Sequence, residues 1–307
     1  MQKSAYTPDE IASLFKIAKN TVYELIKRGE LQAFKVGNKM RISQEEVERY
    51  MAAMRTAPAK KARSHSNLPS LAFTLQLAGS HDFLVEKLVS YVAEENACIT
   101  LSPSYIGSLE GLMMLYRGAA DIAAVHLLDP SSQEYNLPFI RQLFIHEKIT
   151  VIRLASRKQG LIVPKVNRKN IVNFHDLTRN NVTFVNRQKG SGTRFLFDSF
   201  LSTSGISPKE IRGYGKEEWN HLSAASHICS GQADVTFGAS FAASRLDLGF
   251  IPMATEQFDL VFRWTSENET ALMHLLDLLQ VTTFKEHALA CDGYDAAKLG
   301  EIIYQSF

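Results

Sequence analysis

The chain has 307 residues, of which 45% are hydrophobic and 21% are charged, with 9 prolines and 17 glycines. This composition is typical of a folded globular protein and excludes a disordered or fibrous chain. At roughly 150 residues per domain, the length suggests two domains. The formal net charge of +2, taken alone, argues against a protein that binds nucleic acid.

The cysteines and the apolar runs limit the class of protein further. Cys98, Cys229 and Cys291 are far apart and match neither a zinc-ligand spacing nor a disulfide framework. We therefore expect no metal and no resident cofactor. The N-terminus lacks the apolar segment of a secretory signal, and no run approaches 18 apolar residues. These features predict a cytoplasmic protein that does not enter a membrane.

The positive charge is concentrated at the N-terminal end of the chain. Residues 1–67 hold 13 Lys and Arg against 7 Asp and Glu, a net charge of +6, whereas the remainder has a net charge of −4. Residues 55–70 (RTAPAKKARSHSNLPS) have the composition of a linker. We therefore predict a first domain over residues 1–54, a linker over 55–70 and a body over 71–307. The charge asymmetry favours a polyanion as the partner of the first domain.

The first domain carries clear helix signals. A capping box at residues 7–10 (TPDE), with proline at the first helical position, opens one helix. A second helix is predicted over residues 18–28, followed by Gly29 at the position that terminates a helix.

A hairpin and a third helix complete the domain. Two β-prone segments, residues 33–36 and 40–42, flank a Gly-Asn turn. A second capping box at residues 43–46 (SQEE) then opens a helix that runs to about residue 54. The order of helix, turn, helix, hairpin and helix predicts a winged helix-turn-helix domain.

A helix-turn-helix domain places the N-terminal part of its second helix in the major groove of double-stranded DNA. Asparagine can recognise adenine, while lysine and threonine suit phosphates or base edges. The residues predicted to contact DNA from this helix and from the basic hairpin are Lys19, Asn20, Thr21, Tyr23, Lys27, Lys35, Lys39 and Arg41. A solvated basic face and a protein-binding module are the two alternative interpretations.

Residues 6–51 resemble the excisionase-type, MerR-like winged helix-turn-helix family. The resemblance lies in the Thr-Val-Tyr of the second helix, the Arg-Gly-Glu-Leu turn, the Lys-Val-Gly wing and the Arg-Ile strand. One departure is Ala18, where many members have a serine cap. A missing cap costs about 1 kcal/mol of helix stability, but it leaves the surface offered to DNA unchanged. The resemblance implies that this domain binds DNA.

The body alternates strand-like and helix-like segments, which predicts an α/β architecture. Gly79-Ser80 and Gly190-Ser191 each follow an apolar run and precede a helical pattern, 111 residues apart. The motif Gly118-Ala-Ala-Asp121 recurs 113 residues later as Gly231-Gln-Ala-Asp234. Two motifs repeated at nearly one offset predict two similar α/β lobes.

A Gly-Ser turn that opens a helix offers unpaired N–H groups and a hydroxyl, and the helix dipole favours an anion there. Two such turns facing across a cleft could hold one oxyanion, although each turn alone is also an ordinary helix cap. The residues predicted to line this cleft are Ser80, Ser108, Ser191, Gly192 and Thr193. Arg194 would neutralise the anion or pair with Asp121 or another acid, and His81 and His126 are further candidates.

The body shows no arrangement typical of an enzyme. Ser80-His81-Asp82 are adjacent in sequence, whereas a catalytic triad requires convergence in space. The loop at residues 190–194 (GSGTR) lacks the Lys-Ser/Thr of a Walker A loop, and no Gly-x-Ser-x-Gly elbow is present. We therefore predict no catalytic residues.

The body resembles the periplasmic-binding-protein-like domain found behind excisionase-type helix-turn-helix domains. The matching strings include Gly79-Ser-His-Asp82, Gly107-Ser-Leu-Glu-Gly-Leu112 and Asn186-Arg-Gln-Lys-Gly-Ser-Gly-Thr-Arg194. A related domain is appended to some molybdopterin-biosynthesis proteins. One departure is Asn220-His221, where Thr-His is expected. The resemblance implies a type 2 periplasmic-binding-protein fold used as an intracellular sensor, with molybdate- and tungstate-binding transport relatives.

These observations predict a ligand-responsive, bacterial-type transcriptional regulator of the α/β class. Its winged helix-turn-helix would bind operator DNA, and its two-lobed body would bind a small oxyanion, with molybdate or tungstate favoured. A homodimer would supply the two DNA-binding domains needed for two half-sites. The alternatives are a sensor for an organic anion or a pterin-related metabolite, a cofactor-biosynthesis enzyme with an accessory DNA-binding-like domain, and a recombination accessory protein.

Overall fold

The computed structural model describes residues 5–15, 22, 26, 31–36, 39–47, 49, 73–95, 98–289, 291 and 293–306. The chain divides into two compact units, Met1–Leu68 and Pro69–Phe307, here called the head and the body. The predicted linker at residues 55–70 lies outside the described residues, so the domain limits stay a prediction. Within the described part of the chain, no helix has the length and apolar character needed to cross a membrane.

The head contains a three-stranded antiparallel sheet in the order β1-β3-β2. Its described elements are β1 (Ala5–Tyr6), α1 (Pro8–Phe15), β2 (Phe34–Val36) and β3 (Lys39–Ser43). The predicted capping box is present, because Thr7 Oγ1 accepts from the Glu10 N–H and Glu10 Oε2 accepts from the Thr7 N–H. The predicted hairpin is also present, and β1 is a strand that the sequence patterns did not predict.

The core of the head joins residues from every part of the predicted domain. Ile11, Val22, Leu31, Ile42 and Val47 are buried against one another. Most of the predicted second helix lies outside the described residues.

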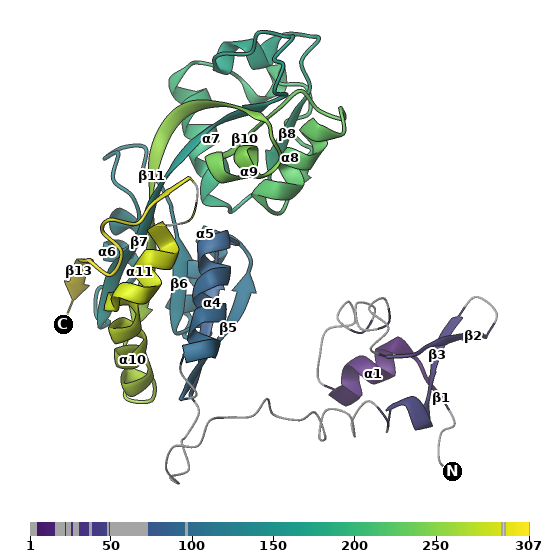
Figure 1. Cartoon of the computed structure of the whole chain (residues 1–307), viewed down its shortest axis with the longest axis vertical. Coiled ribbons are helices and arrows are strands. Elements are labelled where there is room, and N and C mark those ends of the chain that lie inside the picture. The colour runs from purple at the N-terminus through teal and green to yellow at the C-terminus, as the bar shows by residue number, and fades with distance from the viewer. Residues whose placement is uncertain are drawn as a thin grey trace. The chain divides into compact units, whose positions relative to one another are not determined.

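The body is built on one ten-stranded sheet that forms two lobes (Figure 1). The strand order is β5-β4-β6-β11-β7-β10-β8-β9, with β12 and β13 paired to β7. The first lobe contains the parallel strands β4 (Phe73–Gly79), β5 (Ile99–Tyr105) and β6 (Ile122–Val125). The second lobe contains the parallel strands β8 (Phe184–Arg187), β9 (Glu217–Glu218) and β10 (Val235–Ala239).

Two long antiparallel strands, β7 (Ile149–Val163) and β11 (Gly249–Arg263), run through both lobes. At one end they pair with β6 and β13 (Ile302–Ser306), and at the other end β7 pairs with β10. The short strand β12 (Tyr294–Asp295) pairs with the middle of β7. The lobes are therefore connected through the sheet itself, as Figure 1 shows.

Helices cover both lobes. Those of the first lobe are α4 (Phe83–Glu95), α5 (Ser108–Tyr116), α6 (Leu137–Leu143), α10 (Glu269–Gln280) and α11 (Thr282–Leu289). Those between β7 and β11 are η1 (Phe174–Thr178), α7 (Gly192–Thr203), η2 (Pro208–Glu210), α8 (His221–Cys229) and α9 (Ser240–Arg245).

The body contains two large apolar cores. In the first lobe Leu77 and Leu88 are buried between the sheet and α4. In the second lobe three stacked rings dominate, with the Phe197 centroid 4.7 Å from that of Phe184 and 5.5 Å from that of Phe237. The first core also takes in Phe241 and Ala242 of α9, and the Phe241 ring stacks on Tyr294 with centroids 5.7 Å apart. The helix that follows β10 therefore packs against the first lobe.

The predicted repeat of two similar lobes is confirmed. The Asp121 carboxylate accepts from the Gln76 N–H at 2.7 Å, and the Asp121 N–H donates to the Gln76 carbonyl at 2.9 Å. Asp234 makes the same two bonds with Thr183, at 2.7 and 2.8 Å. The glycine three residues before each aspartate has a φ of 72° or 69°. Each motif therefore ties together two neighbouring strands of its lobe in the same way.

Candidate functional site

The two lobes touch where α5 and α7 begin. The Leu109 N–H of α5 donates to the Gly190 carbonyl of the second lobe at 3.1 Å. A Cβ built on Gly192 would lie 2.4 Å from both the carbonyl oxygen and Nδ1 of His126. Glycine at position 192 thus permits a backbone approach that no other residue allows. We call the contact between the starts of α5 and α7, together with the buried polar side chains described below, the lobe junction.

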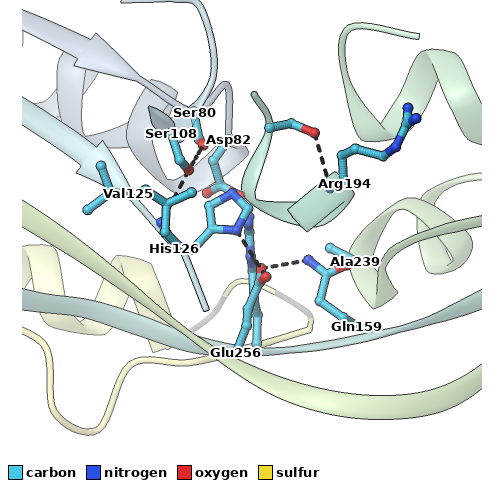
Figure 2. Close-up of polar contacts among 12 residues, drawn as sticks. Ser80, Asp82, Ser108, Val125, His126, Gln159, Arg194, Ala239 and Glu256 are labelled. Atoms are coloured by element: carbon cyan, nitrogen blue, oxygen red, sulfur yellow. Dashed lines mark hydrogen bonds and ion pairs between the residues drawn. The ribbon is translucent and has the colours of Figure 1, made fainter. Parts of the chain in front are cut away.

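Buried hydroxyls of the first lobe lie at the lobe junction (Figure 2). Ser80 Oγ and Ser108 Oγ are 2.7 Å apart, and Ser108 Oγ accepts from the His126 N–H at 3.2 Å. Both serines are buried, although Ser108 is the first residue of a helix. The predicted Gly-Ser turns therefore bring polar groups inside the protein.

The second lobe contributes the N-terminus of α7. Ser191 is an ordinary cap, because its Oγ accepts from the Arg194 N–H at 3.2 Å and donates to the Gln188 carbonyl at 3.0 Å. Thr193 Oγ1 is buried without a hydrogen-bond partner in the described part of the chain. A hydroxyl in this state can serve a ligand without losing an existing bond.

A buried charge network joins the first lobe to the crossing strands. Arg157 of β7 stands opposite Glu256 of β11, and its guanidinium donates to Glu256 and to Asp82. Gln159 Nε2 donates to Glu256 at 2.6 Å, and His126 Nδ1 lies 3.0 Å from Glu256 Oε2. Burial acts to raise the pKa of Glu256, but Arg157, His126 and the hydrogen bond from Gln159 together outweigh it, and the pKa falls to about 2. Glu256 is therefore ionised beside the Arg157 guanidinium.

Arg187, the last residue of β8, is a second buried guanidinium, with 5% of its surface exposed. Its Nε donates to the Glu218 carbonyl at 3.2 Å and its Nη2 to the Trp219 carbonyl at 2.9 Å. Nη1 is buried and has no hydrogen-bond partner among the described residues. Burial, followed by the charge of Arg157, lowers the pKa of Arg187 to about 9.

Two buried histidines accompany these groups. His221 begins α8, and its Nδ1 accepts from the Ala239 N–H at 3.1 Å, which leaves the ring proton on Nε2. Burial and then the charge of Arg187 lower the pKa of His221 well below its ordinary value. Burial also lowers the pKa of His126, against the opposing charge of Glu256. Both rings are therefore neutral near pH 7.

The structure brings together six of the eight residues predicted to bind the ligand: Ser80, Ser108, His126, Ser191, Gly192 and Thr193. His81 contacts Glu86, with its Nε2 2.7 Å from Glu86 Oε1, and its ring packs edge-on against Tyr105. Arg194 pairs with Asp198 and Glu217 and stacks on Tyr214, and its side chain extends away from the lobe junction (Figure 2). Of the two roles predicted for Arg194, the structure therefore shows the pairing with an acid, though with residues other than Asp121.

The sequence patterns missed five polar residues of the lobe junction: Arg157, Gln159, Arg187, His221 and Glu256. Four of them, all except His221, lie in strands, where a charged or amide residue within an apolar run is a signal of a buried polar site. His221 follows the capping residue Asn220, the position of the departure noted from the family.

Most residues predicted to contact DNA lie outside the described part of the chain: Lys19, Asn20, Thr21, Tyr23 and Lys27. The backbones of Lys35 and Lys39 belong to β2 and β3, which form the predicted hairpin. Arg41 of β3 donates from Nη1 to the Met40 carbonyl at 2.9 Å.

A helix-and-hairpin head followed by two α/β lobes on a continuous sheet defines a helix-turn-helix protein with a type 2 periplasmic-binding-protein-like body. Residues 5–55 match the helix-turn-helix domain family, and residues 89–280 match the PBP superfamily domain. The chain therefore belongs to the family defined by the PBP superfamily domain. It is 35% identical over 313 residues to the uncharacterized protein YvgK of Bacillus subtilis (strain 168), with 99% of each chain covered.

Solved structures share the fold of the body. A Clostridium perfringens phosphate ABC transporter substrate-binding protein with bound phosphate is 14% identical, with a TM-score of 0.54, covering 72% of this chain and 98% of that one. The tungstate ABC transporter structure from Geobacter sulfurreducens is 13% identical, with a TM-score of 0.50, covering 69% and 95%. At these identities the likeness concerns the fold alone.

Proposed function

We propose that this protein is a ligand-responsive transcriptional regulator whose head binds operator DNA and whose body binds a small oxyanion between its lobes. Tungstate or molybdate is the favoured ligand. The helix-turn-helix match supports the first part of the proposal, and the periplasmic-binding-protein-like fold supports the second.

The single observation that carries the ligand class is the meeting of two helix N-termini beside buried hydroxyls. The N-termini of α5 and α7 are in contact, with Ser80, Ser108 and Thr193 buried beside them. A helix N-terminus presents N–H groups and a partial positive charge, which favour an anion. Hydroxyl and N–H donors arranged in this way suit the oxygens of a tetrahedral oxyanion. The described residues include no cluster of His, Cys, Asp and Glu that could hold a metal ion.

Closure of the lobes provides the switch. A ligand shifts a conformational equilibrium only by its differential affinity for the two states. An anion held by groups from both lobes binds the closed state better, because opening removes half of its contacts. A body that closes can then reposition two heads in a homodimer and change their fit to two DNA half-sites.

The ligand is tested by following the melting temperature of the full-length protein with tungstate, molybdate, phosphate or sulfate at matched ionic strength. Micromolar tungstate or molybdate should raise the melting temperature, since a ligand that binds only the folded state stabilises it. Stabilisation by phosphate alone would overturn the choice of oxyanion. A pterin or organic acid that stabilises the protein when none of the four anions does would overturn the oxyanion class.

DNA binding is tested by footprinting with and without the stabilising anion. The footprint should be salt-sensitive and should change with the ligand. Replacing Lys35 and Lys39 together by alanine should weaken binding to many sequences uniformly and reduce its salt dependence. Unchanged binding in this double variant would refute the role of the hairpin, and a footprint indifferent to every ligand tested would refute the sensor.

A further inference from the structure

We propose that Arg187 is the residue that neutralises the charge of the ligand between the lobes. The inference rests on the proposed function and deepens it, because it names the positively charged residue of the second lobe that contacts the anion. The ligand class that follows is a small anion carrying a full negative charge, as opposed to a neutral metabolite held by hydrogen bonds alone.

The first argument is the partner set of each buried arginine. Arg157 donates to two carboxylates, those of Asp82 and Glu256. Arg194 has the carboxylates of Asp198 and Glu217. Arg187 is equally buried, but its hydrogen-bond partners among the described residues are backbone carbonyls. A buried charge without a counter-ion is strongly unfavourable, so this guanidinium favours any arrangement that supplies an anion.

The second argument concerns the hydrogen-bond donors near Arg187 that are available to a ligand. Nη1 of Arg187 is buried and unpartnered in the described part of the chain, while Nε and Nη2 are held by the segment just before α8. His221, the first residue of α8, keeps a proton on Nε2 because its Nδ1 accepts from Ala239. The N-terminus of this nine-residue helix adds its own partial positive charge. Arg187 Nη1, the His221 Nε2 proton and the N-terminus of α8 thus all favour an anion at one end of the second lobe.

The third argument is the position of Arg187 between the lobes. It is the carboxyl-terminal residue of β8, and ligands in open α/β sheets bind beyond the carboxyl ends of strands. The charges of Arg157, Glu256 and Asp82 all act on Arg187. Arg157 and Glu256 belong to the strands that cross between the lobes, and Asp82 belongs to the first lobe. Arg187 therefore lies in the same region as the hydroxyls on which the proposed function depends.

The test compares the wild-type protein with R187Q by melting temperature and by calorimetric titration with sodium tungstate. R187Q should lose the tungstate-induced increase in melting temperature and bind at least about tenfold more weakly, the range expected for a hydrogen bond to a charged group. Without ligand, R187Q should melt at the same or a higher temperature, since the substitution removes an uncompensated buried charge. A merely structural role would instead lower the melting temperature and leave affinity unchanged.

R194Q is the matched control, because it removes a buried arginine that already has two carboxylate partners. It should lower the melting temperature of the free protein and retain the tungstate response. If R187Q does not fold, R187M replaces it, because methionine, unlike glutamine, leaves no buried amide to satisfy. Wild-type tungstate affinity in R187Q or R187M would overturn the inference. A wild-type protein that responds to none of the four oxyanions would overturn the proposed function itself.

Discussion

Replacing Gly192 by alanine should prevent the lobes from closing while leaving each lobe intact. The added Cβ would lie 2.4 Å from the carbonyl oxygen of His126 and 2.6 Å from its Cε1. Real Cβ atoms essentially never come within 3.0 Å of such neighbours, and a backbone carbonyl cannot rotate away as a side chain can. The clash is between lobes, since His126 belongs to the first lobe and Gly192 opens α7 of the second.

The magnitude follows from the cost of overfilling a packed contact, roughly 1–3 kcal/mol. Because this cost falls on the closed state alone, affinity for tungstate should decrease by about 5- to 150-fold. The free protein should not be destabilised, because alanine favours a helix by up to about 1 kcal/mol over glycine.

Isothermal titration with tungstate, paired with melting curves of the free protein, measures both quantities. Gly215→Ala is the matched control, since a Cβ at this position meets nothing within 4 Å. It should bind tungstate as the wild type does. If G192A also binds like the wild type, ligand binding does not require the approach of α7 to His126, and the closure mechanism is refuted.

Two further predictions concern stability. Burial lowers the pKa of both His126 and His221, so the unfolded chain binds more protons below its ordinary histidine pKa of 6.5, and acidification should destabilise the body. The free energy of unfolding should fall by about 1.4 kcal/mol per pH unit for each histidine below that value. Glu256, with its lower pKa, keeps its contribution to stability until far more acidic pH. An equal free energy of unfolding in urea at pH 7.5 and 5.5 would contradict this prediction. D121N and D234N should each cost about 1–2 kcal/mol in the same assay without changing tungstate binding, because each weakens a strand contact remote from the lobe junction; a lost ligand response would contradict that separation.

Local signals account for what the sequence predicted correctly. The Gly-Ser turns mark helix starts, and helix starts depend on residues within one turn of each other. The salt bridge of Arg194 with Asp198 also has a local signal, the spacing of four residues on one helix, which favours a structural role for this arginine. The sequence motif drew attention to Arg194, whereas the residue that we propose as the ligand contact, Arg187, lies seven residues earlier in the same motif.

Non-local pairing explains what the sequence could not predict. Arg157 and Glu256 face each other across two strands that are 99 residues apart in the chain. No periodicity within either strand specifies that register. The lack of a counter-ion at Arg187 is likewise a property of its surroundings, because any of the carboxylates elsewhere in the chain could have been its partner.

The charge network also limits where the body can bend. Asp82 and His126 hold Arg157 and Glu256, so the middle of both crossing strands is fixed to the first lobe. A rigid network of this kind does not slide without breaking buried ion pairs, which is costly. The flexible part of the connection must therefore lie on the second-lobe side of Glu256.

The backbone shows a suitable place there. The register of β11 against β7 is interrupted between Pro252 and Ala254, where a residue is left out of the ladder. At Gly160, beside this bulge, the strands approach so closely that a Cβ would lie 2.1 Å from the Ile251 carbonyl oxygen. A bend at this point would move Arg187 and the start of α7 relative to the charge network, and it would have to accommodate the packing of α9 against the first lobe. Under the proposal that Arg187 contacts the ligand, we expect ligand binding and lobe closure to be coupled through this bend.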